Sequence, residues 1–128
     1  MSLPPLIAII DDDGAILTGL SSLLRSASFR VHTYRKAEAF LAKVSTTLPD
    51  CVLTDVQMPG MNGLELQAEL ARQHAGLPVI FMTAFPDEAV QARALAAGAR
   101  AFLHKPFEAQ TILDLLAATV GPPEAGLA

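Results

Sequence analysis

Short apolar runs alternate with segments of helical spacing along the whole chain, and this alternation limits the folds that the chain can adopt. The apolar runs lie at residues 6–10, 31–34, 51–54, 79–82 and 101–103. Ile16, Leu20 and Leu23 fall on one helical face after the first run, while residues 36–44 and 87–97 are Ala-rich helices with a weaker apolar stripe. Strands that alternate with helices in this way predict an α/β fold, in which helices cover both faces of a parallel sheet. We therefore expect strands that are apolar and buried along nearly their whole length.

Residues that cap helices lie where the helical spacing begins or ends. Asp13 or Gly14 can cap the first helix, Asn62 the third and Asp87 the fourth. Gly98 follows the fourth helix, at the position where a glycine with positive φ commonly ends a helix. The capping residues therefore support the same division into elements as the apolar spacing.

Length and composition indicate one domain. The chain has 128 residues, of which 52% are hydrophobic and 17% charged, a balance that favours a buried core over disorder. We assign the domain to residues 5–120. Residues 121–128, GPPEAGLA, are interpreted as a tail or the start of a linker.

Charge and hydropathy argue against several classes of protein. The net charge of −4 argues against direct nucleic-acid binding by this segment, because such binding requires a clustered basic face. No apolar stretch approaches the roughly 20 residues of a membrane span, and the first residues, MSLPPL, lack the pattern of a secretory signal. Cys51 is the only cysteine and lies in an apolar run, so we expect a buried thiol in a cytoplasmic protein.

Polar residues follow four of the predicted strands at the point where each strand ends. The first strand runs into the acids at 11–13, the third ends at Asp55, the fourth at Thr83 and the fifth at Lys105. Parallel strands bring their carboxyl ends to one edge of the sheet, where ligands bind in folds of this kind. We therefore expect carboxylates, a hydroxyl and an ammonium to share one site.

Such a group of acids favours a hard divalent cation. Two carboxylates about 5 Å apart repel by about 3 kcal/mol at an effective dielectric constant of 20, and Lys105 offsets only part of this repulsion. Mg²⁺ prefers oxygen ligands and retains several waters, whereas His32, His74 and His104 are too scattered to form a soft-metal site. We predict Mg²⁺ as the cofactor, with Mn²⁺ able to replace it in vitro.

The same residue types are those that phosphoryl transfer requires. An Asp beside Mg²⁺ is a nucleophile that needs no base, because it is ionised at neutral pH. The cation and Lys105 can neutralise charge on the transferring oxygens, and the Thr83 hydroxyl can donate to one of them.

These residues resemble the receiver domain of two-component response regulators. The resemblance covers about residues 5–120 and rests on four motifs in order, IIDDD, LTDVQMPGMNG, FMTAF and FLHKPF. It implies a flavodoxin-like (βα)5 fold with a sheet in the order 2-1-3-4-5, which a receiver exemplifies in this class. The motif KPF and the Ala-rich fourth helix are similar to receivers of transcription-regulating response regulators of the nitrogen-fixation and LuxR-linked type.

The resemblance implies a role for each residue of the acidic site. Asp55 is expected to accept the phosphoryl group, while Asp12 binds Mg²⁺ directly and Asp11 binds it largely through water. The Gln57 carbonyl is expected to be a further ligand of the cation, and the Lys105 ammonium binds the phosphoryl group.

Further residues are expected to switch the domain and to set the lifetime of its phosphoryl group. By resemblance, Thr83 is the switch hydroxyl, and Phe102 occupies the position of an aromatic rotamer switch. That position is often Tyr, and since Phe lacks the hydroxyl, any switch here works by packing alone. Gln57 and Phe85 lie at the two positions that tune the lifetime, where the bulk of Phe85 is expected to hinder the attacking water. Receivers usually have a cis peptide bond at the position of Lys105–Pro106.

The resemblance predicts a signalling module rather than an enzyme with a separate substrate. The phosphoryl donor is expected to be a sensor histidine kinase or a small acyl phosphate, and the domain promotes only its own phosphorylation and dephosphorylation. Phosphorylation is expected to alter the face formed by the fourth helix, fifth strand and fifth helix. That face can then form a homodimer or bind an output domain, and a DNA-binding output domain would follow Ala128.

Three alternatives remain open. A haloacid-dehalogenase-like phosphatase also forms an aspartyl phosphate, but its motif has an acid where this chain has Gln57. A nucleotide or flavin binder of similar fold is disfavoured, because the first turn lacks G-x-G-x-x-G and is acidic. An adaptor that works without phosphorylation is disfavoured by the presence of all the acceptor-site residues.

Overall fold

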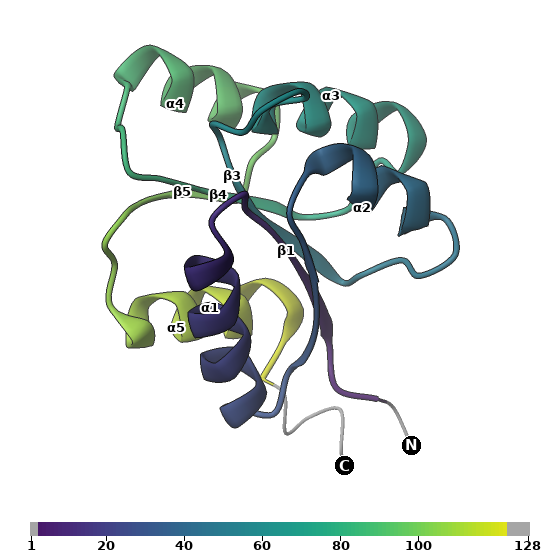
Figure 1. Ribbon diagram of the computed structural model, residues 1–128, viewed down its shortest axis with the longest axis vertical. Coiled ribbons are helices and arrows are strands. Elements are labelled where there is room, and N and C mark those ends of the chain that lie inside the picture. The colour runs from purple at the N-terminus through teal and green to yellow at the C-terminus, as the bar shows by residue number, and fades with distance from the viewer. Residues whose placement is uncertain (1–2, 123–128) are drawn as a thin grey trace.

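The computed structural model describes residues 3–122 as five strands and five helices that alternate along the chain (Figure 1). In chain order the elements are β1 (Leu6–Ile10), α1 (Gly14–Ser26), β2 (Arg30–Tyr34), α2 (Ala37–Val44), β3 (Cys51–Asp55), α3 (Gly63–Gln73), β4 (Val79–Thr83), α4 (Glu88–Ala96), β5 (Ala101–His104) and α5 (Ala109–Val120). Most of the predicted tail at 121–128 lies outside the described residues. None of the helices within residues 3–122 is both long and apolar enough to cross a bilayer.

The strands form one parallel sheet in the order β2-β1-β3-β4-β5, which confirms the predicted order. Helices α1 and α5 cover one face of this sheet, and α2, α3 and α4 cover the other (Figure 1). Successive residues of a strand point to opposite faces, so a strand covered on both sides has to be apolar throughout. In β1, Ala8 and Ile10 belong to the core cluster under α2, α3 and α4, whereas Ile7 and Ile9 belong to the cluster under α1 and α5.

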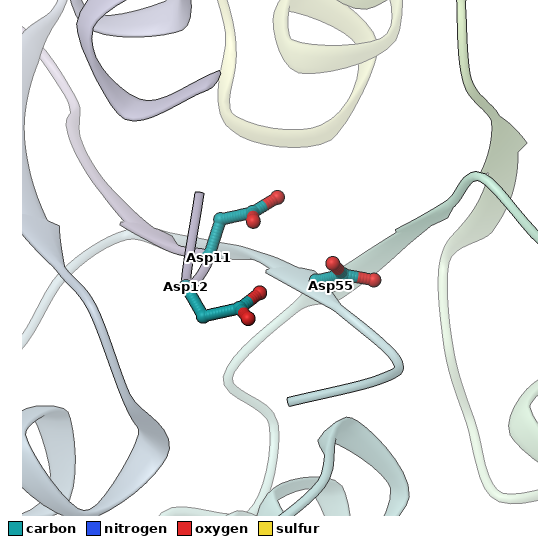
Figure 2. A group of neighbouring side chains, drawn as sticks. All are labelled: Asp11, Asp12 and Asp55. Atoms are coloured by element: carbon teal, nitrogen blue, oxygen red, sulfur yellow. The ribbon is translucent and has the colours of Figure 1, made fainter. Parts of the chain in front are cut away.

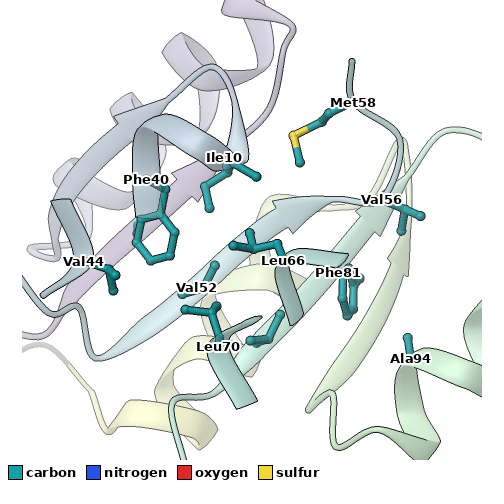
Figure 3. Close-up of a cluster of buried hydrophobic side chains, with 13 residues drawn as sticks. Ile10, Phe40, Val44, Val52, Val56, Met58, Leu66, Leu70, Phe81 and Ala94 are labelled. Atoms are coloured by element: carbon teal, nitrogen blue, oxygen red, sulfur yellow. The ribbon is translucent and has the colours of Figure 1, made fainter. Parts of the chain in front are cut away.

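The first of these clusters lies between the sheet and helices α2, α3 and α4 (Figure 3). Phe40 of α2, Leu66 and Leu70 of α3 and Phe81 of β4 are fully or almost fully buried in it. Helix α4 contributes a single fully buried residue, Ala94, which agrees with the weak apolar stripe of its sequence.

The prediction that every strand is nearly continuously buried is wrong for the two outer strands. All residues of β1, β3 and β4 are buried, but Val31 is the only buried residue of β2, and β5 has none. The reason is that β2 and β5 each pair with one neighbour only, so the outer edge of each is open to solvent.

The helix caps follow the sequence prediction. Asp13, rather than Gly14, caps α1, Asn62 caps α3 in a reciprocal capping box, and Asp87 caps α4. Gly98 has φ of +104°, the left-handed region that permits glycine to end α4. The caps at Asp13, Asn62 and Asp87 fix where the loops that follow β1, β3 and β4 enter their helices.

Candidate functional site

The polar residues predicted at the strand ends meet at one edge of the sheet. Strands β3 and β4 each extend one residue beyond the predicted run, so that Asp55 and Thr83 are the last residues of their strands. In the parallel register Asp55 lies opposite Met82, and Thr83 lies opposite His104, the residue before Lys105.

The centre of the site is a group of carboxylates from the loop after β1 and from the last residue of β3 (Figure 2). Asp11, Asp12 and Asp55 each offer one oxygen, and these oxygens lie within 4.8 Å of one another. Asp11 is fully buried and Asp55 almost so, whereas Asp12 is exposed at the mouth of the site. The arrangement is therefore a pocket of buried charge with one side open to solvent.

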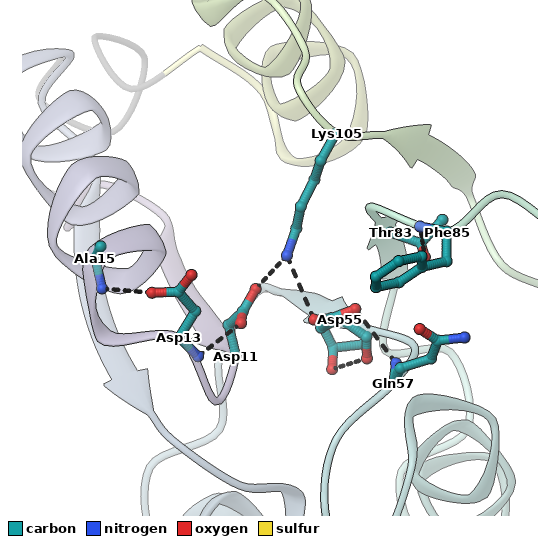
Figure 4. A network of polar contacts seen from close by, with 9 residues as sticks. Asp11, Asp13, Ala15, Asp55, Gln57, Thr83, Phe85 and Lys105 are labelled. Atoms are coloured by element: carbon teal, nitrogen blue, oxygen red, sulfur yellow. Dashed lines mark hydrogen bonds and ion pairs between the residues drawn. The ribbon is translucent and has the colours of Figure 1, made fainter.

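A single ammonium group bridges the two buried acids. Lys105 Nζ lies 2.6 Å from Asp11 Oδ2 and 3.3 Å from Asp55 Oδ2 (Figure 4). The Lys105 backbone nitrogen donates to the Thr83 carbonyl at 2.7 Å, and the peptide bond to Pro106 is cis, as expected from the resemblance. One ammonium against the acids of this group leaves an excess of negative charge.

Backbone N–H groups orient the remaining carboxylate oxygens. Asp13 N donates to Asp11 Oδ1 at 2.9 Å, and Gln57 N donates to Asp55 Oδ1 at 3.2 Å. Each buried carboxylate thus points one oxygen at its own loop and the other at Lys105. This arrangement fixes the direction of both carboxylates before any ligand arrives.

The site perturbs the ionisation of the acid at its centre. Burial raises the pKa of the Asp55 carboxyl and the charge of Asp11 raises it further, while the charge of Lys105 opposes both without cancelling them. Burial by itself would lower the pKa of Lys105, but its interactions with Asp11 and then Asp55 outweigh burial, so the pKa of the ammonium is raised. The Lys105 ammonium is therefore held in its charged form, whereas ionisation of Asp55 costs free energy.

Helix α3 starts directly beneath Asp55 because its first residue is a glycine. Gly63 N donates to the Val56 carbonyl at 2.8 Å. A Cβ at Gly63 would lie 2.5 Å from the Asp55 carbonyl oxygen and 3.0 Å from Phe81 Cε1. A side chain at this position would therefore displace the strand end that carries Asp55.

Thr83 lies beside this group rather than within it. Its side chain is 1% exposed, and its Oγ1 accepts a hydrogen bond from Phe85 N at 3.0 Å (Figure 4). Phe85 itself is 70% exposed at the start of the loop into α4. The Thr83 hydroxyl is therefore hydrogen-bonded to the backbone of the loop that follows β4.

Phe102 packs in an aromatic row along β5. Its ring lies 6.0 Å from that of Phe81 and 6.0 Å from that of His104, with an edge-on geometry to the latter. The Phe102 side chain is partly buried, and His104 is exposed, where its Nε2 lies 3.3 Å from Gln91 Oε1 of α4. The row thus links the core, β5 and α4.

Sequence reasoning missed two residues that contact the loops of the site. Arg35 donates to the Asp12 carbonyl, and the Glu38 carboxylate accepts from Met61 N. Neither residue belongs to a motif, and both lie after β2, which supplies none of the acids. Only the pairing of β2 beside β1 reveals why they reach the site.

The residues present fit a divalent cation. The donors are carboxylate oxygens, which Mg²⁺ prefers, and the exposed side at Asp12 leaves room for the waters that this ion retains. A cation would also offset the repulsion between acids that Lys105 leaves uncompensated.

The response regulator receiver domain family matches residues 7–117 of this chain. The chain belongs to that family. The match begins at the second residue of β1 and includes the other four strands and all the acids of the site, so the fold and the resemblance predicted from the motifs are confirmed together.

This receiver domain is similar to several curated regulators. It is 41% identical over 110 residues to response regulator protein TmoT of Ectopseudomonas mendocina, covering 86% of this chain and 50% of that protein. It is 36% identical over 118 residues to transcriptional regulatory protein FixJ of Bradyrhizobium diazoefficiens, covering 92% of this chain and 58% of that protein. The chain thus spans about half the length of the curated relatives it matches.

Solved structures show the same fold. Response regulator StyR superimposes with a TM-score of 0.84 at 39% identity, covering 95% of this chain and 62% of that chain. A CheY-like receiver domain protein from Methanospirillum hungatei gives a TM-score of 0.88 at 28% identity, covering 97% and 98%. The flavodoxin-like (βα)5 arrangement predicted from the sequence is therefore confirmed.

Proposed function

We propose that this receiver domain accepts a phosphoryl group on Asp55 in a Mg²⁺-dependent reaction. The observation that carries the proposal is the convergence of three carboxylates and one ammonium, with Lys105 Nζ joined to both Asp11 and Asp55. Family membership supplies the expectation, and the geometry of the acids supports it.

The Asp11, Asp12 and Asp55 carboxylates and the Gln57 carbonyl are the proposed ligands of the cation. Asp12 binds directly and Asp11 largely through water. When bound, Mg²⁺ neutralises negative charge on the phosphoryl oxygens as they approach the acids, and Mn²⁺ is expected to do the same in vitro. The raised pKa of Asp55 supports this proposal, since its charged form lacks sufficient compensation from Lys105 alone.

In the proposed reaction an Asp55 carboxylate oxygen attacks phosphorus in line with the leaving group. A P–O bond to Asp55 forms while the P–N bond of a kinase phosphohistidine breaks, and the electron pair of that bond returns to the imidazole nitrogen. Lys105, which bridges the two buried acids at 2.6 and 3.3 Å, can move its ammonium to a phosphoryl oxygen. Attack by water later releases phosphate, so the domain acts on its own aspartyl phosphate and on no other substrate.

The new phosphoryl oxygens are proposed to draw the Thr83 hydroxyl away from Phe85 N. Phosphorylation adds about one negative charge at Asp55, and the Thr83–Phe85 hydrogen bond is the contact that would be exchanged. Phe102 then repacks along β5, and the α4–β5–α5 face changes its shape. The sparse burial of α4 and β5 favours such movement.

Gln57 and Phe85 are proposed to set the lifetime of the aspartyl phosphate. Both side chains are exposed beside the acceptor, Gln57 two residues after Asp55 and Phe85 two after Thr83. The bulk of Phe85 restricts the approach of water to phosphorus.

The proposed partners are a sensor histidine kinase and an output module. The curated relatives are about twice as long as the matched region, and FixJ is named a transcriptional regulatory protein, which supports a DNA-binding output domain outside this chain. The α4–β5–α5 face is the proposed surface for a homodimer or for that output domain. A free, buried Cys51 thiol agrees with a cytoplasmic location.

Intact-mass measurement after incubation with acetyl phosphate tests the proposal. With Mg²⁺, the wild type is expected to gain the mass of one phosphoryl group, and Asp55→Asn is expected to gain none. Asp114→Asn is the matched control, because Asp114 is an exposed acid of α5 whose carboxylate accepts from Gln110 Nε2, and it should behave as the wild type does. The proposal fails if the wild type gains no mass with Mg²⁺ or if Asp55→Asn gains as much as the wild type. Sustained hydrolysis of p-nitrophenyl phosphate would instead favour the phosphatase alternative.

A further inference from the structure

The segment that runs from the last residue of β2 into α2 contacts the loops that follow β1 and β3. The Tyr34 carbonyl accepts from Asp11 N at 3.1 Å, and Arg35 donates from its guanidinium to the Asp12 carbonyl at 3.0 Å. Glu38, in the first turn of α2, accepts from Met61 N at 3.2 Å. None of these three residues contributes a carboxylate to the acidic group.

The two contacted loops are far apart in sequence and belong to different strands. The first loop follows β1 and contains Asp11 and Asp12, while the second follows β3 and runs from Val56 to Asn62. Because β2 lies beside β1, the segment at its end passes the first loop before α2 reaches the second. Residues 34–38 therefore connect, by hydrogen bonds, the loop that carries Asp11 and Asp12 to the loop that carries Gln57 and directly follows Asp55.

The second loop is shaped to receive Glu38. Gly60 has φ of +76°, and a Cβ built on it would lie 2.5 Å from Glu38 Oε2. A side chain at this position would push the carboxylate away from Met61 N. Hydrogen bonds from the Glu38 backbone and from Met61 lower the pKa of the Glu38 carboxyl, so it acts as a charged acceptor.

The Arg35 guanidinium brings a positive charge to the first loop in addition to its hydrogen bond. The guanidinium of Arg35 lies against the start of α1, 3.7 Å from the position that a Cβ of Gly14 would occupy. It binds the carbonyl of Asp12, the exposed acid at the mouth of the site. Holding this carbonyl restrains the peptide group after Asp12 and hence the backbone from which the Asp12 carboxylate projects.

We propose that Arg35 and Glu38 are positioning residues for the metal site, and that they clamp the two ligand-bearing loops at a fixed separation. The clamp rests on the proposed function, because it assigns to these residues an effect on Mg²⁺ bound by Asp11, Asp12 and Asp55. Groups that hold metal ligands in place commonly affect affinity without touching the ion.

Mg²⁺ titration followed by NMR of amide groups tests the clamp in the whole chain. Arg35→Ala and Glu38→Ala are each expected to weaken Mg²⁺ binding about threefold, as the loss of an exposed hydrogen bond implies. The double variant should bind about tenfold more weakly, because the two residues hold different loops. Glu38→Gln, whose amide oxygen can still accept from Met61 N, should bind nearly as the wild type does.

The control is an Arg and a Glu elsewhere in the same protein. Arg72 and Glu69 of α3 pair at 2.6 Å, away from the acids. Arg72→Ala and Glu69→Ala remove the same charges and should leave Mg²⁺ affinity unchanged. Equal weakening in these controls, or unchanged affinity in the Arg35 and Glu38 double variant, would overturn the clamp.

A second readout needs no metal and separates the clamp from the proposed function. In metal-free protein, Glu38→Ala should speed hydrogen exchange at the Met61 amide, and Arg35→Ala should shift the Asp13 amide resonance, whose peptide group contains the Asp12 carbonyl. Absence of both changes overturns the clamp even where the wild type binds Mg²⁺. A wild type that binds no Mg²⁺ instead overturns the proposed function, and with it the effect of the clamp on metal.

Discussion

The centre of the sheet and its β5 flank are built differently. Every residue of β1 and β3 is buried, and the acids lie at the ends of these two strands. On the flank, β5 has no fully buried residue, and α4 buries only Ala94 while Leu95 is 43% exposed. The same sheet thus joins a tightly packed platform to a loosely packed edge.

This difference suits the two tasks that the proposed function requires. Phosphoryl transfer depends on groups held in place before the reaction, and buried strands with oriented carboxylates provide that. Switching depends on an element that moves at low free-energy cost, and a helix with one buried residue provides that.

The largest expected difference is between two phenylalanines of the same region. Phe81 is fully buried in β4, whereas Phe85 is 70% exposed four residues later. Phe81→Ala should lower the free energy of unfolding by about 3–5 kcal/mol, and Phe85→Ala should change it by less than about 0.5 kcal/mol. Urea unfolding measures both, and similar costs for the two variants would contradict the contrast.

A glycine substitution under Asp55 is expected to be next in size. Gly63→Ala places a Cβ against the Asp55 carbonyl and Phe81, and should cost about 2 kcal/mol. Gly19→Ala is the control, since its Cβ meets nothing within 4 Å in the middle of α1. It should raise the free energy of unfolding by up to about 1 kcal/mol. A Gly63→Ala protein as stable as the wild type would show that the end of β3 can shift without loss of stability.

Removal of the central charge is expected to stabilise the protein when Mg²⁺ is absent. Because the pKa of Asp55 is higher in the folded than in the unfolded chain, its ionised form costs stability above that pKa. Asp55→Asn should therefore raise the free energy of unfolding by about 1 kcal/mol at pH 7, and Lys105 keeps its 2.6 Å partner Asp11.

The gain in the free energy of unfolding should depend on pH. The gain should disappear as the pH falls below the ordinary pKa of an unfolded Asp, where both states are protonated. Saturating Mg²⁺ should reverse the order, because it stabilises the wild type more than a variant that lacks one of the proposed carboxylate ligands. A destabilised Asp55→Asn protein in metal-free buffer at pH 7 would contradict the account.

The smallest expected effect concerns the attachment of α4. Gln67 of α3 is buried, and its Nε2 donates to the Ala94 carbonyl at 3.0 Å. Gln67→Leu keeps most of the volume but removes this bond, so the α4 amides should exchange about fivefold faster, with those of α1 unchanged. Gln73→Leu is the control, because Gln73 is exposed on the same helix. Equal rates of hydrogen exchange at the α4 amides in both variants would show that other contacts hold this helix.

Sequence patterns predicted the fold and the composition of the acidic group. Strand ends in a parallel sheet share an edge, so Asp11, Asp55, Thr83 and Lys105 could be placed together from their order alone. The caps at Asp13 and Asn62 could also be predicted, because capping depends on residues that are close in sequence.

Contacts between loops of different strands could not be predicted. The exposure of β2 follows from its place at the edge, which an apolar run does not specify. The contacts of Arg35 with Asp12 and of Glu38 with Met61 each join residues 23 apart in sequence and depend on how the segment after β2 lies against the two loops. Exposed charged residues have no spacing rule that distinguishes such contacts from solvated side chains.

Locating the phosphoryl group in the chain tests whether Asp55 is the acceptor. After incubation with acetyl phosphate, borohydride reduces an aspartyl phosphate to homoserine, which peptide mass mapping then finds. The account predicts homoserine at Asp55 alone, and only where Mg²⁺ was present. Homoserine at Asp11 or Asp12, or equal conversion of Asp55 in excess chelator, would contradict it.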